Sequence, residues 1–321
     1  MNIFIIGSGT FGTAIANELC RNENNNVIIF SRSKEKKDEI NHLHTNKKYF
    51  PGKKLNDSLV STNECSEIND ADVIFLALPS STIIENIKYF SNYITSNQIV
   101  VNLSKGILSN SQTIIEYLTE ELRSNNLISL KGPSFAVEIM NRAETVLTLG
   151  YSNEKQKEII FKIFSKTCIN LESTTDIHGV EILGVIKNIY AILLGIIDEK
   201  FKSPNSRYMV LSKALNEIKI LNNLFKGSTE TIFLACGLGD ICLTSYNELS
   251  RNRTLGKEIG KGLFNSRKNN MNVVEGVNSL KIIYPLLELS TLKKLPLLEK
   301  LFLFFDSEIN EIDIDLKELY N

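Results

Sequence analysis

The chain begins with a short apolar segment that runs directly into a glycine-rich loop. Ile3-Phe4-Ile5-Ile6 is followed by Gly7-Ser8-Gly9-Thr10-Phe11-Gly12, which has the spacing G-x-G-x-x-G. In a dinucleotide-binding βαβ unit the first glycine permits the tight turn, the second lets the backbone approach the phosphates, and the third lets the helix pack on the strand. A helix over 10–21 and a second strand over 27–30 complete the expected unit. The loop is therefore predicted to hold a dinucleotide pyrophosphate at a helix N-terminus.

The end of the second strand indicates which dinucleotide binds. An NAD-specific site places Asp or Glu about 20 residues after the loop, where it binds the ribose 2′-hydroxyl. This chain has Ser31-Arg32-Ser33 there instead. A guanidinium and a hydroxyl suit a 2′-phosphate. We therefore expect NADP(H) to be preferred, with NAD(H) as the alternative cofactor; the competing interpretation is that Arg32 is an ordinary solvated charge.

Length and composition restrict the class of protein. A chain of 321 residues is long enough for two domains, and 43% apolar with 23% charged residues is typical of a soluble protein. A net charge of −1 favours neither nucleic acid nor an anionic membrane as partner. The five cysteines lack C-x-x-C spacing and the three histidines form no metal motif. We expect a cytoplasmic protein with free thiols, no metal, no signal peptide and no membrane insertion.

The first half alternates apolar strands with amphipathic helices, which predicts a doubly wound Rossmann-type sheet. From about residue 176 the periodicity is helical to the C-terminus. We therefore expect a dinucleotide-binding domain over 1–172 and an all-α substrate-binding domain over 173–321. The further strands expected are 71–79, 98–103, 127–130, 145–149 and 168–171; the helices are 33–42, 154–165, 179–200, 208–224, 229–234, 240–249 and 278–305.

A lysine stands within the apolar segment 179–197. Charges at mid-span are expensive in lipid, so the segment predicts a buried helix rather than a membrane span. A buried lysine needs an anionic partner, a lowered pKa or a catalytic use. For Lys187 a structural ion pair with Asp240 or Glu181 is the alternative to catalysis. The segment also carries small residues that would let another helix approach closely: Gly184, Ala191 and Gly195.

A second group of polar residues follows a glycine-rich break at 237–239. On a continuous helix, Asp240, Thr244 and Arg251 would lie within about 40° of one another. Arg251 with Asn252 beside it offers bidentate and neutral donors, which suit a phosphate monoester. A solvated turn over 250–253 is the competing interpretation.

Together these segments carry a specific resemblance that covers nearly the whole chain. The chain resembles the NAD(P)-dependent glycerol-3-phosphate dehydrogenases of the bacterial type, which supply glycerol 3-phosphate for phospholipid synthesis. The order and spacing of the motifs are specific, although each alone is modest. The motifs are G-S-G-T-F-G-T-A at 7–14, N-K-K-Y-F-P-G at 46–52, S-K-G at 104–106, G-P-S-F-A at 132–136, the segment 176–188, G-L-G-D at 237–240, S-R-N at 250–252 and V-V-E-G at 273–276.

The resemblance implies roles for individual residues. Lys187 would be the acid/base at the substrate carbonyl, and Lys105 and Arg251 would touch both substrate and cofactor. The substrate set is Lys105, Gly132, Ser134, Lys187, Asn188, Asp240, Thr244, Ser250, Arg251 and Asn252. The cofactor set is Gly7, Gly9, Thr10, Phe11, Gly12, Ser31, Arg32, Tyr49, Lys105, Ala136, Arg251, Val273 and Glu275.

The implied reaction is the reversible reduction of dihydroxyacetone phosphate to sn-glycerol 3-phosphate, by a homodimer. One departure concerns residues 203–214, where the family usually has the run G-N-N-T-K-A-A-L-I-T-R-G; here both glycines are replaced and the arginine becomes Lys213. A loop and a cationic contact near the site are therefore expected to differ. Two other functions stay open: a reductase of the same architecture acting on a 2-oxo acid or ketopantoate, and a non-catalytic NADPH-binding sensor.

Overall fold

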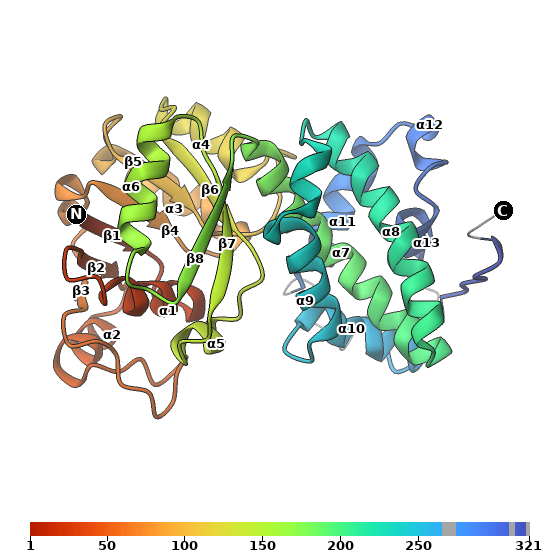
Figure 1. The fold of residues 1–321 in the computed structure, drawn as a ribbon, viewed down its shortest axis with the longest axis horizontal. Helices are drawn as coiled ribbons and strands as arrows, with labels where there is room; N and C mark the ends of the chain where they lie inside the picture. The colour runs from red at the N-terminus through yellow and green to blue at the C-terminus, as the bar shows by residue number, and fades with distance from the viewer. Residues whose placement is uncertain (265–273, 308–311, 319–321) are drawn as a thin grey trace.

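The computed structural model describes residues 1–264, 274–307 and 312–318, and it shows a sheet domain beside a helical domain (Figure 1). The strands of the sheet domain lie in the order β3-β2-β1-β4-β5-β6-β7-β8. All neighbours are parallel except β6 and β7, which are antiparallel. The strands are β1 Asn2–Ile6, β2 Asn26–Phe30, β3 Val60–Thr62, β4 Val73–Leu76, β5 Ile99–Asn102, β6 Leu127–Lys131, β7 Thr145–Gly150 and β8 Ile169–Thr174. This confirms the doubly wound, Rossmann-type prediction.

Helices cover both faces of this sheet because successive strand side chains point to opposite faces. On β1, Ile3 and Ile5 join one apolar core, while Phe4 and Ile6 join another. The first core is closed by α1 (Thr10–Leu19), α5 (Ala136–Met140) and α6 (Glu154–Phe164). The second is closed by α3 (Ile83–Phe90) and α4 (Ile114–Leu122). On the first of these faces, α1 begins at the glycine-rich loop.

The helical domain is built around α7 (Ile177–Phe201), which is buried from Gly179 to Ile197. Helices packed around it exclude it from solvent, and the 18-residue apolar window that would be long enough to cross a membrane is wholly buried. The predicted buried core helix is confirmed (Figure 1). The remaining helices of this domain are α8 Pro204–Leu224, α9 Asp240–Tyr246, α10 Arg251–Gly260, α11 Glu275–Ile283, α12 Leu289–Leu292 and α13 Pro296–Asp306.

Two helix predictions were wrong in their extent. The single helix expected over 278–305 is divided into α11, a 3-10 turn over Tyr284–Leu286, α12 and α13. Pro285 and Pro296 supply no backbone N–H, so the helix cannot continue through them, and Pro296 instead opens α13. The helix expected over 240–249 ends at Tyr246, and α10 begins separately at Arg251.

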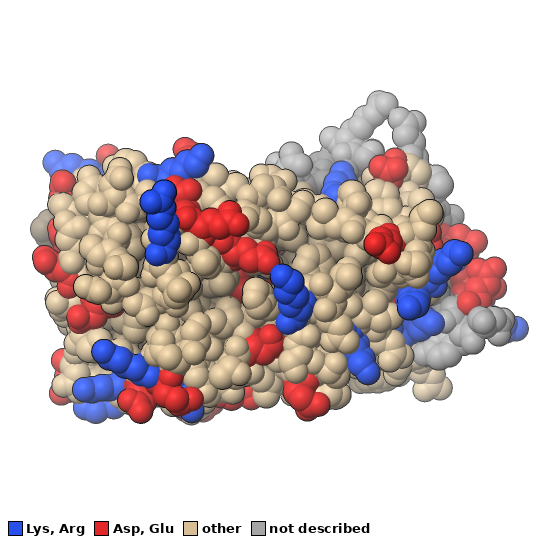
Figure 2. Space-filling view, turned by 90° about the horizontal axis from the view of Figure 1, so that it is seen from above, with Lys and Arg blue, Asp and Glu red and all other residues tan. Residues whose placement is uncertain are grey.

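Elements with weak patterns were not predicted at all. These include the three-residue β3, which pairs only with β2, and the helices α3, α4 and α10. The sheet ends at Thr174 and α7 begins at Ile177, so the domain boundary that we placed between 172 and 173 falls within β8. On the face seen in Figure 2, acidic and basic side chains are interspersed over both domains, as the near-zero net charge leads one to expect.

Candidate active site

The carboxyl ends of the central strands meet the helical domain at one edge of the sheet. The chain order reverses between β1 and β4, and such a switch point forms the ligand crevice of a doubly wound sheet. Lys105 follows β5 at this edge, and Gly132 follows β6. From the other domain, α7 supplies Lys187 and the start of α9 supplies Asp240.

The glycine-rich loop has the geometry that a dinucleotide requires. Gly7 has φ +120°, and a Cβ there would lie 2.3 Å from the Ala77 carbonyl oxygen. A Cβ on Gly12 would lie 1.9 Å from the Gly7 carbonyl oxygen, so both positions need glycine. A Cβ on Gly9 would contact nothing within 4 Å, and no side chain caps the first turn of α1, where Thr10 and Phe11 lie. Free N–H groups and open space at Gly9 fit a pyrophosphate.

Lys187 and Asp240 form a buried ion pair at the junction of the domains. The Lys187 Nζ lies 2.8 Å from Asp240 Oδ1 and donates to Thr244 Oγ1 at 2.6 Å. Lys187 is 7% exposed and Asp240 is 1% exposed. The structure therefore brings these three predicted residues together, and of the two partners considered for Lys187, it selects Asp240.

The charges in this cluster shift the pKa values of both partners. Burial lowers the pKa of Lys187 to about 8, against the opposing effect of Asp240 and with the help of the Lys105 charge. For Asp240 burial alone would raise the pKa, but the ammonium groups of Lys105 and Lys187 outweigh it and lower the pKa. The cluster therefore contains a carboxylate and a lysine whose proton is unusually labile.

Lys105 connects the sheet domain to the same carboxylate. Its Nζ donates to Asp240 Oδ2 at 2.7 Å and to the Gly132 carbonyl at 3.2 Å. Ser134 Oγ also donates to the Gly132 carbonyl, at 3.1 Å. Lys105 is partly exposed, whereas Asp240 is buried. Asp240 thus holds two ammonium groups, one from each domain.

Asn188 and Asn252 form a second polar contact beside the ion pair. Asn252 Nδ2 donates to Asn188 Oδ1 at 3.0 Å, and Asn188 Nδ2 donates to Glu275 Oε2 at 3.2 Å. The backbone N–H of Gly276 donates to Asn252 Oδ1 at 3.0 Å. The start of α10 is therefore joined to α7 and α11 by hydrogen bonds.

The predicted phosphate-binding motif lies at the N-terminus of α10. Ser250 caps the helix by accepting from the Arg253 N–H, and Arg251 is the first helical residue. Arg251 is exposed, while Asn252 is buried. The prediction that Asp240, Thr244 and Arg251 share the face of one helix is wrong, because the chain leaves the helix between Tyr246 and Arg251. The solvated-turn interpretation is also wrong.

The other residues predicted to bind the cofactor lie in different surroundings. Ser31 is fully buried, and its hydroxyl accepts from Ser61 Oγ at 2.9 Å. Arg32 is exposed just after β2. The centre of the Tyr49 ring lies 4.9 Å from the Lys36 Nζ. Ala136 begins α5. Val273 lies outside the described residues.

A buried ion pair that sequence reasoning missed lies behind the site. Lys131 Nζ lies 2.8 Å from Glu181 Oε1, which also accepts from Asn102 Nδ2 at 2.8 Å and from the Ser129 hydroxyl. Lys131 Nζ further donates to the Asn102 carbonyl at 2.9 Å. Burial lowers the pKa of Lys131, against the effect of Glu181. A lysine ending an apolar strand and a glutamate in an apolar helix were the available signals.

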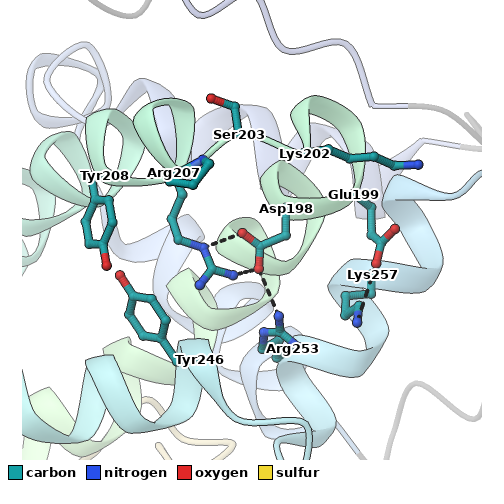
Figure 3. A pocket seen from close by; sticks show the side chains of 10 residues that line it. Asp198, Glu199, Lys202, Ser203, Arg207, Tyr208, Tyr246, Arg253 and Lys257 are labelled. Atoms are coloured by element: carbon teal, nitrogen blue, oxygen red, sulfur yellow. Dashed lines mark hydrogen bonds and ion pairs between the residues drawn. The ribbon is translucent and has the colours of Figure 1, made fainter.

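The segment 203–214, which departs from the family pattern, forms the first half of α8 rather than a loop. Ser203 caps the helix and Pro204 occupies its first turn. Arg207 and Arg253 both pair with Asp198, and the Arg207 guanidinium lies 4.4 Å from the centre of the Tyr246 ring (Figure 3). These contacts surround a cavity of about 410 Å³ that the residues around Lys187 do not line. Arg207 of this segment therefore contacts the end of α9 and, through Asp198, is linked to α10. These contacts are separate from the cluster of Lys105, Lys187 and Asp240.

A doubly wound domain with a dinucleotide loop, joined to a helical domain that carries a buried lysine, defines the class of two-domain nicotinamide-dependent dehydrogenases. Residues 2–157 match the N-terminal family "NAD-dependent glycerol-3-phosphate dehydrogenase N-terminus", and residues 176–312 match the corresponding C-terminal family. The chain belongs to the NAD-dependent glycerol-3-phosphate dehydrogenase family.

Individual proteins of this family are similar to this chain over most of their length. Glycerol-3-phosphate dehydrogenase [NAD(P)+] of Orientia tsutsugamushi is 34% identical over 294 residues, which are 89% of this chain and 88% of that protein. The protein of that name from Teredinibacter turnerae is 32% identical over 88% of this chain and 84% of its own. The crystal structure of glycerol-3-phosphate dehydrogenase from Coxiella burnetii is similar with a TM-score of 0.83 and 25% identity, over 99% of this chain and 97% of that one.

Proposed function

We propose that this protein catalyses the reversible reduction of dihydroxyacetone phosphate to sn-glycerol 3-phosphate with NADPH or NADH. The observation that carries the proposal is the buried Lys187–Asp240–Lys105 cluster at the crevice where the dinucleotide domain meets the helical domain. Family membership supports the substrate, since the similar proteins bear the name of this activity.

The bound nicotinamide would supply the hydride. The residues of the chain supply the proton and orient the group that donates it. Lys187 as ammonium donates a hydrogen bond to the carbonyl oxygen of the substrate and then transfers its proton to the developing alkoxide. Asp240 and Thr244 fix the Lys187 Nζ, at 2.8 and 2.6 Å, so that the ammonium is oriented before the substrate arrives. A pKa of about 8 keeps the proton available at neutral pH and also lets it leave.

The substrate phosphate is assigned to the start of α10. Arg251 offers a guanidinium at the first helical position, where the helix N-terminus also favours an anion. Asn252 is anchored to Asn188, so the position of Arg251 is tied to the residue next to Lys187. Gly132 and Ser134 belong to the sheet domain, and Lys105 connects them to the helical domain, since it donates to both the Gly132 carbonyl and Asp240. Binding of the phosphate would then orient the carbonyl carbon.

NADP(H) is proposed to be preferred to NAD(H). The end of β2 offers no carboxylate for a ribose 2′-hydroxyl, since Ser31 and Arg32 occupy that place. The hydroxyl of Ser31 is engaged by Ser61, so the support for the preference rests on the exposed Arg32.

The proposal is tested by following NADPH oxidation with several ketones. Dihydroxyacetone phosphate should be reduced rapidly, and dihydroxyacetone and ketopantoate slowly. Preferred reduction of ketopantoate or another 2-oxo acid would support the related reductase instead, and binding of NADPH without turnover of any ketone would support a sensor. The complete ion-pair cluster favours a catalyst over a sensor.

The same proposal extends to the setting of the enzyme. We infer a homodimer in the cytoplasm that supplies glycerol 3-phosphate for phospholipid synthesis, without a nucleic acid partner and without membrane insertion. All five cysteines are free thiols, which is typical of a reducing compartment. Size-exclusion chromatography with light scattering tests the dimer.

A further inference from the structure

Three cationic side chains from separate segments gather beside the glycine-rich loop. Arg32 lies at the end of β2, Lys36 in α2 (Lys34–Asp38), and Lys48 in the loop before Phe50. The Nζ of Lys36 lies 3.5 Å from the carbonyl oxygen of Ser8, the residue between Gly7 and Gly9. Lys36 is therefore placed at the loop itself, whereas the sequence had indicated Arg32, with Lys34 immediately behind its segment, as the cation for this site.

Two of these cations, Lys36 and Lys48, lie over the ring of Tyr49. The Nζ atoms of Lys36 and Lys48 lie 4.9 and 5.7 Å from the centre of the Tyr49 ring. The Ser8 carbonyl, which Lys36 contacts, is also held by Asn46 Nδ2 at 3.2 Å, and the same Nδ2 donates to Thr13 Oγ1 at 2.9 Å. The cationic group is therefore built on ordered contacts to the loop and to α1.

Two positive charges, those of Lys48 and Arg32, and one negative charge, that of Glu39, act on Lys36. The pKa of Lys36 is lowered first by partial burial and then by the charges of Lys48 and Arg32. Glu39, whose Oε1 accepts from Thr45 Oγ1 at 2.8 Å and from the Lys47 N–H at 2.7 Å, acts in the opposite direction, but its effect on the pKa is smaller than that of either cation. Mutually repelling cations at one place favour binding of an anion.

The location identifies the anion. In a dinucleotide site the adenosine ribose lies between the glycine-rich loop and the end of the second strand, and the phosphate of NADP(H) is attached at its 2′ position. We propose that Lys36 is a specificity-determining residue that binds this 2′-phosphate together with Arg32 and Lys48. The inference rests on the proposed use of NADP(H), and it assigns much of the preference to Lys36 rather than to Arg32 alone.

The test compares Lys36→Ala with Lys37→Ala in the full chain. Lys37 is a matched control because it lies on the same helix and carries the same charge, but its Nζ donates to Asn63 Oδ1 at 3.0 Å, away from Ser8. Calorimetry would measure binding of 2′-AMP and 5′-AMP, and fluorescence titration would measure NADPH and NADH. A charge-assisted contact at a partly exposed site should make Lys36→Ala lower the ratio of NADPH to NADH affinity about tenfold. Lys36→Arg should retain most of the ratio.

Several outcomes would overturn the inference. Equal losses in Lys36→Ala and Lys37→Ala would indicate general electrostatics, and an unchanged NADPH to NADH ratio in Lys36→Ala would remove Lys36 from the site. Binding of 2′-AMP no tighter than 5′-AMP to the unsubstituted protein would show that no 2′-phosphate site exists. A different result would contradict the proposed reaction and not the role of Lys36: an unsubstituted protein that does not reduce dihydroxyacetone phosphate with saturating NADH.

Discussion

Asp240 pairs with both Lys105 and Lys187, so these three residues together carry one excess positive charge. Because Asp240 and Lys187 are buried, that excess is weakly screened by solvent. A ketone whose oxygen becomes negative during reduction, and which also bears a phosphate, would compensate it. The excess positive charge therefore stabilises the transition state, in which the ketone oxygen becomes negative.

The pH dependence of turnover should report the proton on Lys187. Burial lowers the pKa of Lys187 to about 8, so the ammonium predominates below that pH and the amine above it. Reduction needs the ammonium, and kcat for reduction should therefore fall as pH rises through about 8. Oxidation of glycerol 3-phosphate needs the amine as base, and its kcat should rise over the same interval.

The control for this profile is Lys187→Met, which keeps much of the volume and removes the charge. We expect its turnover to fall by about 10²–10⁴, as for other acid/base groups, and the inflection near the lysine pKa to disappear. Near-normal turnover in this variant, or kcat values of the unsubstituted enzyme that do not change with pH through about 8 in either direction, would show that Lys187 is structural.

Arg251 should determine discrimination between phosphorylated and unphosphorylated ketones. Loss of a charged contact costs about 1.5–3 kcal/mol, so Arg251→Ala should reduce the preference for dihydroxyacetone phosphate over dihydroxyacetone roughly tenfold to hundredfold. Both kcat and KM should change, because phosphate binding positions the reacting carbon. Thr254→Ala, an exposed position on the same helix, is the matched control. An undiminished preference would place the phosphate elsewhere, with Lys105 as the next candidate.

At the scale of elements, the strong periodic patterns were sufficient to predict the buried strands and α7. Of the contacts distant in sequence, the Lys187–Asp240 pair was named from the sequence as one of two alternatives, whereas others were not predicted. The apolar runs of β1, β4 and β5 appear in the structure within two or three residues of their expected ends. The small residues on α7 indicated a close helix contact, and Gly195 makes one with α10, whereas Gly184 faces the Lys131 side chain of β6 and not a helix. The Lys131–Glu181 pair joins residues 50 positions apart, so no local pattern could reveal it.

The contact between α7 and α10 should depend on glycines in both helices. A Cβ on Gly256 would lie 2.0 Å from the Ile192 carbonyl oxygen, and one on Gly195 would lie 2.5 Å from that of Arg253. Gly256→Ala must therefore push α10 away from α7, which should cost about 1–3 kcal/mol of unfolding free energy. Since Asn252 and Arg251 lie on α10, KM for the phosphorylated ketone should also rise.

Chemical denaturation and steady-state kinetics of Gly256→Ala would measure these two effects. Thr254→Ala again serves as the control, because it changes an exposed position of α10. A Gly256→Ala protein with unchanged stability and unchanged KM would mean that the two helices have room to separate without moving the site.

At the scale of the whole molecule, the two domains are joined by polar contacts at the same edge that carries the chemistry. Lys105 and Asp240 make one of these contacts, and the Lys131–Glu181 pair makes another. Lys131 ends β6 and Asn102 ends β5, while Glu181 lies in the second turn of α7. The relative position of the domains and the position of Lys187 along α7 therefore depend on the same buried interactions.

Removing one member of this pair should destabilise the protein more than removing the charge of both. Lys131→Met leaves Glu181 buried without its cation, which typically costs about 3–5 kcal/mol. In Lys131→Met/Glu181→Gln the side-chain oxygen still accepts from Asn102 and Ser129 with no charge to neutralise, so most of the lost stability should return. Urea denaturation of the two variants measures the difference, and digestion by a glutamyl endopeptidase after Glu172, in β8 just before the junction, reports loosening between the domains. If the double variant is as unstable as the single one, the loss comes from packing of the Lys131 side chain against Gly184 rather than from an unpaired charge.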